Sequence, residues 1–404
     1  MDIGNIATTG MQAAMSNMET ISNNIANAQT LGFKKSSATF SDIVPSGSNA
    51  SGSQIGLGVQ LSGVQQNFQP GGAIQTTAPS DFSISGNGFF ILHNQTSGQA
   101  VYSRSGHLTF DKQTGTFMSG TQRLQGFLAV NGLIPSGSAP ADLVVNTATQ
   151  PAKASATVTA QGLNLNSGST APTTTPFSAT DNTSYNFTTH STLYDSLGNS
   201  NSLDLYYVKT GTNAWSVYTA VNGSVQNAAT PGTATFSDTG QLLSTTGLSG
   251  FSYTPSTGAA ALNFSVSLAG STQTGSGNSI SSVTADGYPA GQFIGYAVDN
   301  NGMLSANYSS GPAVLVGQIA VANFQSPQNL QNLGGATWAA TTAAGSPSVT
   351  PSNSLSNIQQ GFLESSNVDL SAELVNLISA QNTFQANAQV EQVFTQVMQT
   401  VTKL

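Results

Sequence analysis

The stretch NNIANAQTLGFKK, from Asn23 to Lys35, ends a helix-like segment and precedes a long sequence rich in Ser, Thr, Gly and Asn. Upstream of it and into its first residues, small apolar residues recur every three or four positions, which keeps them on one face of an α-helix. Gly32 is the expected end of this helix, because glycine readily adopts the left-handed conformation that follows many helices. The stripe consists of Ile3, Ala7, Gly10, Ala14, Met18, Ile21, Ile25 and Ala28.

The other end of the chain predicts a second long helix, from Leu370 to Leu404. Asn367 or Asp369 is the expected N-cap, and Glu373 lies in the first turn, where the helix dipole favours a negative charge. Such a helix would be about 50 Å long at 1.5 Å per residue, and its length predicts a coiled-coil-like partner. One apolar stripe contains Leu370, Leu374, Leu377, Phe384 and Ala388, and another contains Val390, Phe394, Val397, Val401 and Leu404.

The residues between the two helices predict antiparallel β-structure. Apolar and polar residues alternate around short turns in SDFSISGNGFFILHN, in the block around SLGNSNSLDLYYVK, and in the segment that contains DNNG. Asx-Gly pairs of this kind are strong hairpin signals. Polar linkers rich in Pro or Gly, such as 45–52 and 69–72, separate the blocks. Because β-blocks flank a central one, the β-domains are expected to be nested in the chain.

The composition excludes several classes of function. Charged residues make up 6% of the chain and the net charge is −8, against about 25% charged residues in an average protein. No Lys or Arg occurs between Lys209 and Lys403, so nothing favours binding to nucleic acid. The chain has no cysteine, which excludes disulfides and thiolate metal ligands.

Targeting signals are not evident at the N-terminus. The sequence begins MDIGNIATTGMQAAM, with an acidic second residue and no basic region before an apolar run. No run of about 18 apolar residues predicts a membrane span. We therefore expect a protein that is not inserted in a membrane and that, if exported, leaves without a cleaved signal peptide.

No constellation of residues predicts an enzyme. The three histidines, His93, His107 and His190, lie far apart and lack zinc-site spacing, so each is expected to be a strand or loop residue. Gly86–Gly88 does not follow the phosphate-loop pattern and is expected to form a tight turn. No G-x-S-x-G elbow occurs. We expect no catalytic residues, no cofactor and no metal.

Lys34 and Lys35 form the only basic pair in the chain. An anion site is one interpretation. We favour another, in which they are helix-end cations, favourable to the dipole, followed by a solvated turn.

Several segments resemble a known family. ANAQTLGFKK, from Ala26 to Lys35, resembles the Ala-Asn-x-x-Thr-x-Gly-Phe-Lys motif of the axial rod and hook proteins of the bacterial flagellum. SGNGFFIL, YSRSGHLTFD and LQGF resemble the next block of that family, and ESSNVDLSAELVNLISAQNTFQANAQV resembles its C-terminal block. The middle segments LYDSLGNSNSLDLYYVK and IAVANFQSPQNLQNLGG are similar to the hook members rather than the distal rod members.

The resemblance implies a multidomain α+β fold, with the N- and C-terminal helices paired as a coiled-coil-like inner domain and two mainly antiparallel β outer domains. The implied limits are 1–28 plus 369–404 for the inner helical polymerisation domain and 29–72 plus 336–368 for a connector. They are 73–145 plus 284–335 for the first β-domain and 146–283 for the outer β-domain.

The implied function is that of a non-enzymatic subunit of a curved, flexible tube that transmits torque from rod to filament as a universal joint. The implied partners are other copies of the chain, the distal rod protein, the hook-filament junction proteins, the hook cap protein and the flagellar type III export apparatus. The implied location is the extracellular hook of the flagellum. A distal rod protein and, from a different class, a secreted β-rich adhesin are the alternatives.

The resemblance also implies roles for particular residues. The family motif falls on Ala26, Asn27, Thr30, Gly32, Phe33 and Lys34. Phe40 and Val44, in TFSDIV, are similar to the Phe-x-x-x-apolar element that engages the export gate. The expected contacts of the inner helical layer are Ile3, Ala7, Gly10, Ala14, Met18, Ile21, Ile25, Leu370, Leu374, Leu377, Phe384, Val390, Phe394, Val397 and Val401.

Overall fold

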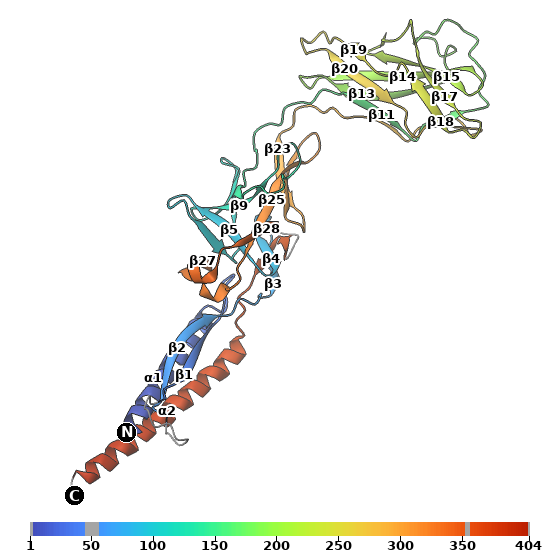
Figure 1. Cartoon of the computed structure of the whole chain (residues 1–404). Coiled ribbons are helices and arrows are strands. Elements are labelled where there is room, and N and C mark those ends of the chain that lie inside the picture. The colour runs from blue at the N-terminus through green and yellow to red at the C-terminus, as the bar shows by residue number, and fades with distance from the viewer. Residues whose placement is uncertain (1–2, 45–55, 352–355, 403–404) are drawn as a thin grey trace. The chain divides into compact units, whose positions relative to one another are not determined.

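The computed structural model describes residues 3–44, 56–351 and 356–402, and the chain divides into two compact units (Figure 1). The terminal unit comprises Met1–Asn146, Tyr296–Ala306 and Val314–Leu404, and the inserted unit comprises Thr147–Gly295 and Asn307–Ala313. The predicted linker 45–52 lies outside the described residues. The predicted limits 146–283 end twelve residues before the first segment of the inserted unit does.

Two long helices at the ends of the chain pack against each other in the terminal unit. They are α1 (Ile3–Ala26) and α2 (Leu370–Val401). Asn24 on α1 contacts Glu373 on α2, and Gly10 lies against Asn387, so the helices run antiparallel. Asp369 is the N-cap of α2 and accepts hydrogen bonds from two backbone amides of the first turn. The predicted pairing of the terminal helices is therefore confirmed.

The end of α1 differs from the prediction. The helix stops at Ala26, six residues before Gly32, and a series of turns follows. Gly32 does have a positive φ of 69°. Its role is close packing, because a Cβ at this position would lie 2.7 Å from the backbone nitrogen of Ser105.

A β-hairpin lies along α1 and joins the helices to the β-structure (Figure 1). It consists of β1 (Ser36–Asp42) and β2 (Val59–Gln66), which pair antiparallel with a shift in register between Thr39 and Phe40. Asn24 fixes the start of β1 through two hydrogen bonds with the backbone of Ser36, at 2.7 and 2.8 Å.

The rest of the terminal unit is β-structure around an aromatic core. In the described residues its largest sheet has twelve strands. Phe68, Phe89, Phe324 and Trp338 make edge-to-face contacts at its centre. The strands of this sheet are β5 (Phe89–Asn94), β6 (Ala100–Ser103), β7 (Thr109–Asp111), β8 (Thr116–Ser119), β9 (Gln122–Leu128), β10 (Ala141–Asp142), β23 (Phe293–Val298), β24 (Met303–Tyr308), β25 (Val314–Asn323), β26 (Gln331–Gly334), β27 (Thr337–Ala339) and β28 (Ser348–Pro351).

Two short antiparallel pairs connect this sheet with the helices. They are β3 (Ala73–Gln75) with β30 (Phe362–Glu364), and β4 (Phe82–Gly86) with β29 (Ser356–Gln360). Two single-turn 3₁₀ helices, Pro327–Asn329 and Thr342–Ala344, complete the unit. Gly86 and Gly88, both at positive φ, connect β4 to β5 as the predicted tight turn. The predicted DNNG hairpin joins β23 and β24.

The inserted unit has one core shared by its sheets. Side chains of both main sheets, among them Trp215, Tyr207 and Phe264, are buried together. The predicted hairpin at SLGNSNS is present, because Tyr194 pairs with Ser200. The first sheet contains β13 (Phe187–Tyr194), β14 (Ser200–Gly211), β15 (Ala214–Val221), β16 (Ser224–Val225), β17 (Gly232–Phe236) and β18 (Leu242–Thr246). The others contain β11 (Thr157–Gln161), β12 (Asn164–Asn166), β19 (Phe251–Tyr253), β20 (Leu262–Ser267), β21 (Thr272–Thr274) and β22 (Ser282–Ala285).

Most strand pairs are antiparallel, and β11–β20 and β12–β21 are parallel. The mainly β architecture with paired terminal helices confirms the predicted α+β fold.

Candidate functional site

The expected helical contacts divide into two groups. On α1, the side chains of Ala7, Ala14 and Ile21 are buried, whereas Gly10, Met18 and Ile25 are half-buried. On α2, Leu377, Phe384 and Phe394 are half-buried. The remaining residues expected to form helical contacts on α2 are exposed, and these are Leu370, Leu374, Val390, Val397 and Val401.

Two groups of exposed apolar side chains on α2 are here called patches, and Val375, Met398 and Val401 are exposed as well. The first patch is Leu370, Leu374 and Ile378, and the second patch is Val390, Val393 and Val397. Val393 is 59% exposed and Val397 is 53% exposed. At 3.6 residues per turn, the centres of the two patches lie roughly 130° apart around the helix. The two patches therefore face different directions around the helix.

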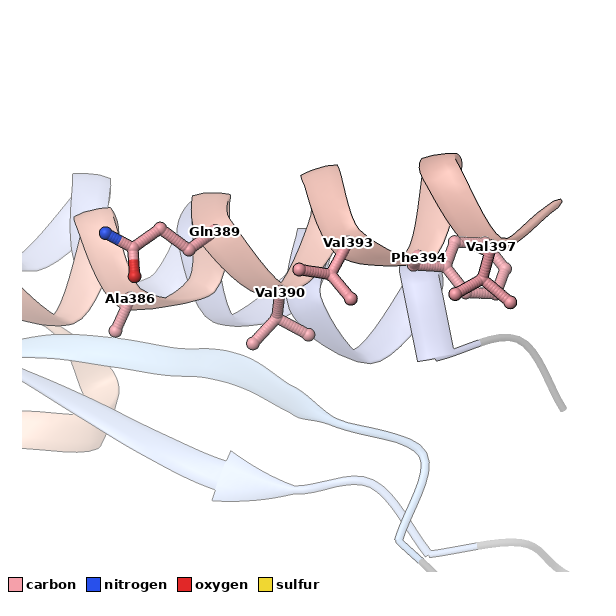
Figure 2. Close-up of a pocket in the computed structure, with 6 residues that line it drawn as sticks. All are labelled: Ala386, Gln389, Val390, Val393, Phe394 and Val397. Carbon is pink, nitrogen blue, oxygen red and sulfur yellow. The ribbon is translucent and has the colours of Figure 1, made fainter. Parts of the chain in front are cut away.

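The second patch borders a groove of about 550 Å³. It is lined by Ala386, Gln389, Val390, Val393, Phe394 and Val397, and Figure 2 shows these side chains along the C-terminal half of α2. Gln389 is the one polar residue in this lining. Exposed apolar surface of this kind marks an interaction site more often than a free surface.

A buried ion cluster lies where the helices meet the β-structure. The Nζ of Lys34 is 2.5 Å from Oε1 of Glu364, and Nη1 of Arg104 is 3.2 Å from Oε2 of the same carboxylate. All three side chains are at most 3% exposed. Lys34 also donates to the backbone carbonyl of Gln69, and Glu364 accepts from the amide of Gly71.

Lys34 is therefore not the helix-end cation that the sequence predicts, because it is buried and lies eight residues after α1 ends at Ala26. The prediction failed because the partner of Lys34, Glu364, is 330 residues away in the sequence. Burial lowers the pKa of Lys34, Glu364 opposes this shift, and the nearby Arg104 adds to it. Burial likewise lowers the pKa of Arg104.

Lys35 forms a second ion pair at the helix seam. Its Nζ lies 3.1 Å from Oε1 of Glu373, whose other oxygen accepts a hydrogen bond from Asn24. Glu373 is buried although it belongs to the first turn of α2. Lys34 and Lys35 therefore bind two different segments near the C-terminus, Lys34 through Glu364 on β30 and Lys35 through Glu373 on α2.

The other motif residues shape the turn after α1. The amide of Asn27 donates to the backbone of Asn23, and its side-chain oxygen accepts from Thr30. Phe33 is half-buried and Ala26 is exposed. Phe40 and Val44 are 37% and 61% exposed.

Sequence reasoning missed Asn24, Arg104 and Glu364 as partners of the motif lysines. No local pattern in the sequence indicates these contacts, because each partner lies far away along the chain.

The histidines take part in local pairs. Nδ1 of His93, His107 and His190 faces the carboxylates of Asp142, Asp81 and Asp204 respectively. Among residues 3–44, 56–351 and 356–402, no group of three or more His, Asp or Glu residues could hold a metal ion. Neither helix, over its described length, is long and apolar enough to cross a membrane.

Comparisons with known proteins identify the family. The model "Flagella basal body rod protein" matches residues 5–34, "Flagellar basal body protein FlaE D2 domain" matches 164–288, and "Flagellar basal body rod FlgEFG protein C-terminal" matches 359–404. The chain is 37% identical to the flagellar hook protein FlgE of Salmonella typhimurium, over 98% of each chain. The chain belongs to the flagellar hook protein FlgE family.

Other FlgE proteins agree with this assignment. That of Escherichia coli is 35% identical, over 98% of each chain. The crystal structure of Helicobacter pylori flagellar hook protein FlgE2 matches with a TM-score of 0.53 and 13% identity, over 72% of this chain and 100% of that chain, and so supports the common fold. FlgE membership makes the chain a structural subunit of the flagellar hook and not an enzyme. It excludes the adhesin alternative and favours the hook over the distal rod.

Proposed function

We propose that this chain polymerises with copies of itself into the curved tube of the hook, which acts as a universal joint between rod and filament. The observation that carries the proposal is the uncovered apolar surface of α2. A helix that exposes Val390, Val393 and Val397 leaves a costly surface in water unless another subunit covers it.

The position of the two patches favours an open polymer. When one surface of a subunit binds a different surface of the next, the contact is heterologous and yields rings or helical filaments. The first and second patches lie on different faces of α2, so a second copy can occupy each independently. The proposal includes the inner helical layer of the tube, in which the expected residues of α1 and α2 form the contacts.

The low charge content supports the flexible behaviour. Subunits of a bending tube must exchange contacts between the inner and outer side of the bend, which requires alternative packings of similar free energy. Fixed salt bridges would favour one packing, whereas hydroxyl and amide side chains exchange hydrogen bonds with water. Only 6% of residues are charged, as such a contact surface requires.

The proposed partners are the neighbours of a hook in the flagellum. The distal rod protein and the hook-filament junction proteins would contact the two ends of the tube, and the hook cap protein would contact its growing end. The rod protein family model that matches residues 5–34 supports a lattice shared with the rod. The proposed location is outside the cell, after export by the flagellar type III apparatus without cleavage of a signal peptide.

Phe40 and Val44 are the proposed export element. Phe40 lies on β1 and is 37% exposed, and Val44 follows the strand and is 61% exposed. Exposed apolar residues four positions apart suit recognition of a short segment by the export gate. Replacing both with alanine should lower the amount of exported chain at least fivefold, whereas Leu61→Ala, on the paired strand, should leave export unchanged.

The test of polymerisation is sedimentation of the purified full-length chain under conditions that promote assembly. The proposal predicts tubes in the pellet and a soluble fraction that falls above a critical concentration. A chain that stays monomeric at all concentrations, or that stops at a dimer, contradicts it.

A further inference from the structure

The seam between α1 and α2 contains several polar residues at positions that are buried or half-buried. Apart from Ala388, which is also half-buried, the buried and half-buried positions of α2 follow alternating steps of four and three residues, as in a coiled coil. Three of these seven positions are polar, although few residues in the chain are charged. The seam positions are Glu373, Leu377, Ala380, Phe384, Asn387, Glu391 and Phe394.

Asn387 has a matching space on α1 at Gly10. A Cβ at Gly10 would lie 2.8 Å from Nδ2 and 2.9 Å from Cγ of Asn387, closer than unstrained packing allows. Glycine in a helix interior is less favourable than alanine. Its presence is explained if it leaves room for the amide of Asn387.

Glu391 has a similar space at Gly4. A Cβ at Gly4 would lie 3.1 Å from Oε2 of Glu391 and 3.0 Å from the ring of Phe394. That carboxylate oxygen is buried and has no hydrogen-bond partner among the described residues. Gly4 lies in the first turn of α1, which contains no acidic residue of its own over the described length. The carboxylate of Glu391 therefore lies beside the first turn of α1, at the positive end of its dipole.

These contacts can all form in only one axial alignment of α1 and α2. At the far end of the seam, Asn24 donates to Glu373 at 3.2 Å. A shift of α1 by one heptad would place Asn387 opposite Asn17 and Glu391 opposite Met11. Neither residue offers the space of a glycine, and Met11 cannot balance a carboxylate, so the shifted alignment is penalised at two positions.

We propose that the pairs Asn387–Gly10 and Glu391–Gly4 fix the axial register of the two terminal helices. Polar residues at core positions of coiled coils specify register in the same way. The register decides which part of α2 lies beyond the N-terminus of α1, and thus where the second patch is presented. Only this last consequence rests on the proposed function, because the register belongs to a single chain.

The test measures the distance between spin labels on the two helices in the full-length monomer. The chain has no cysteine, so cysteines introduced at Ser22 and Gln396 would carry the only labels. These exposed positions should be about 30 Å apart along the helices, and a slip of one heptad changes the distance by about 10 Å. The measurement does not require assembly, so its failure is distinct from failure of the proposed function.

The first set of variants moves the asparagine to position 10 and the glycine to position 387. Gly10→Asn should reduce the fraction of chains at the native distance at least fivefold and create a displaced population. The double variant Gly10→Asn/Asn387→Gly should restore that fraction to within twofold of the parent chain, because the amide then fits the new glycine. Gln12→Asn and Gln385→Gly, on exposed faces, are the matched controls and should leave the distance unchanged.

Glu391→Leu tests the other pair. It removes one of the two penalties on the shifted alignment, so at least a tenth of the chains should show the displaced distance, whereas Gln392→Leu should show none. The proposal is overturned if the parent chain lacks a dominant distance, if Gly10→Asn has no effect, if the double variant is no better than Gly10→Asn, or if Glu391→Leu matches its control.

Discussion

Lys34 and Glu364, 330 positions apart in the sequence, form a buried ion pair with 2.5 Å between Nζ and Oε1. Lys34 follows the N-terminal helix, and Glu364 precedes the C-terminal one. The pair therefore joins the segment that leaves the N-terminal helix to the segment that leads into the C-terminal helix. Arg104 adds a contact from the β-structure itself.

Removing this carboxylate should be costly. Glu364→Gln leaves two buried cations without their common partner, and breaking a buried pair in this way typically costs about 3–5 kcal/mol. Urea unfolding in a Trp215→Phe background would measure it, because Trp338 then reports on the terminal unit alone. Lys153→Ala breaks the exposed pair with Asp286 in the inserted unit. Measured through Trp215 in a Trp338→Phe background, it should change the free energy of unfolding of that unit by less than about 1 kcal/mol. Equal effects would contradict the role of burial.

The inserted unit should lose stability at alkaline pH because of Tyr207. Burial raises the pKa of Tyr207 from 10.0 to about 12. The unfolded chain therefore releases this proton at lower pH than the folded one, and the stabilisation present below pH 10 is lost progressively up to about pH 12. Relative to pH 8, the loss at pH 11 should be about 1.4 kcal/mol.

The control for this prediction is Tyr207→Phe in a Trp338→Phe background, in which Trp215 reports on the inserted unit. Between pH 8 and pH 11, the free energy of unfolding of the parent should fall by that amount relative to that of the variant. A difference independent of pH would show that burial does not perturb this phenol.

The second patch should be needed for assembly but not for folding. Val393→Asp places a charge in the groove of Figure 2 and should reduce the polymerised fraction at least tenfold. Because Val393 is 59% exposed, the free energy of unfolding should change by less than about 0.5 kcal/mol. Gln396→Asp adds the same charge at an exposed polar position nearby and should polymerise at least five times better than Val393→Asp. Normal polymerisation of Val393→Asp would exclude the second patch from the interface.

The N-cap of α2 should stabilise the helix measurably. Oδ1 of Asp369 accepts hydrogen bonds from the amides of Ser371 and Ala372, at 2.9 and 3.1 Å. Asp369→Ala should lower the free energy of unfolding of the terminal unit by about 1 kcal/mol, measured through Trp338 as above. Asp369→Asn should retain most of the stability, and an alanine variant as stable as the parent would contradict the capping role.

Local patterns in the sequence predict part of this structure well. Asp369 was recognisable as an N-cap because its chemistry acts over three residues, and the stripe around Ala7, Ala14 and Ile21 follows from helical spacing. The same spacing could not separate seam from surface on α2, since Val390 and Val397 repeat as regularly as Phe384. Only the position of α1 decides which of these residues are covered.

Long-range partners set the limit of that prediction. The environment of Lys34 depends on Glu364 and Arg104, and none of their neighbours in the sequence indicates the contact. Asn387 and Glu391 likewise read as surface residues of an amphipathic helix until Gly10 and Gly4 are placed opposite them. The spacing of apolar residues therefore says least about where charged and polar residues lie in the fold.

Electron microscopy of basal bodies from a hookless, otherwise flagellated strain that expresses this chain tests the central claim most directly. The account predicts curved tubes between rod and filament in the parent chain, and their loss in Val393→Asp. Straight rods that end without a bend, or basal bodies that carry no added structure although the chain is exported, would contradict it.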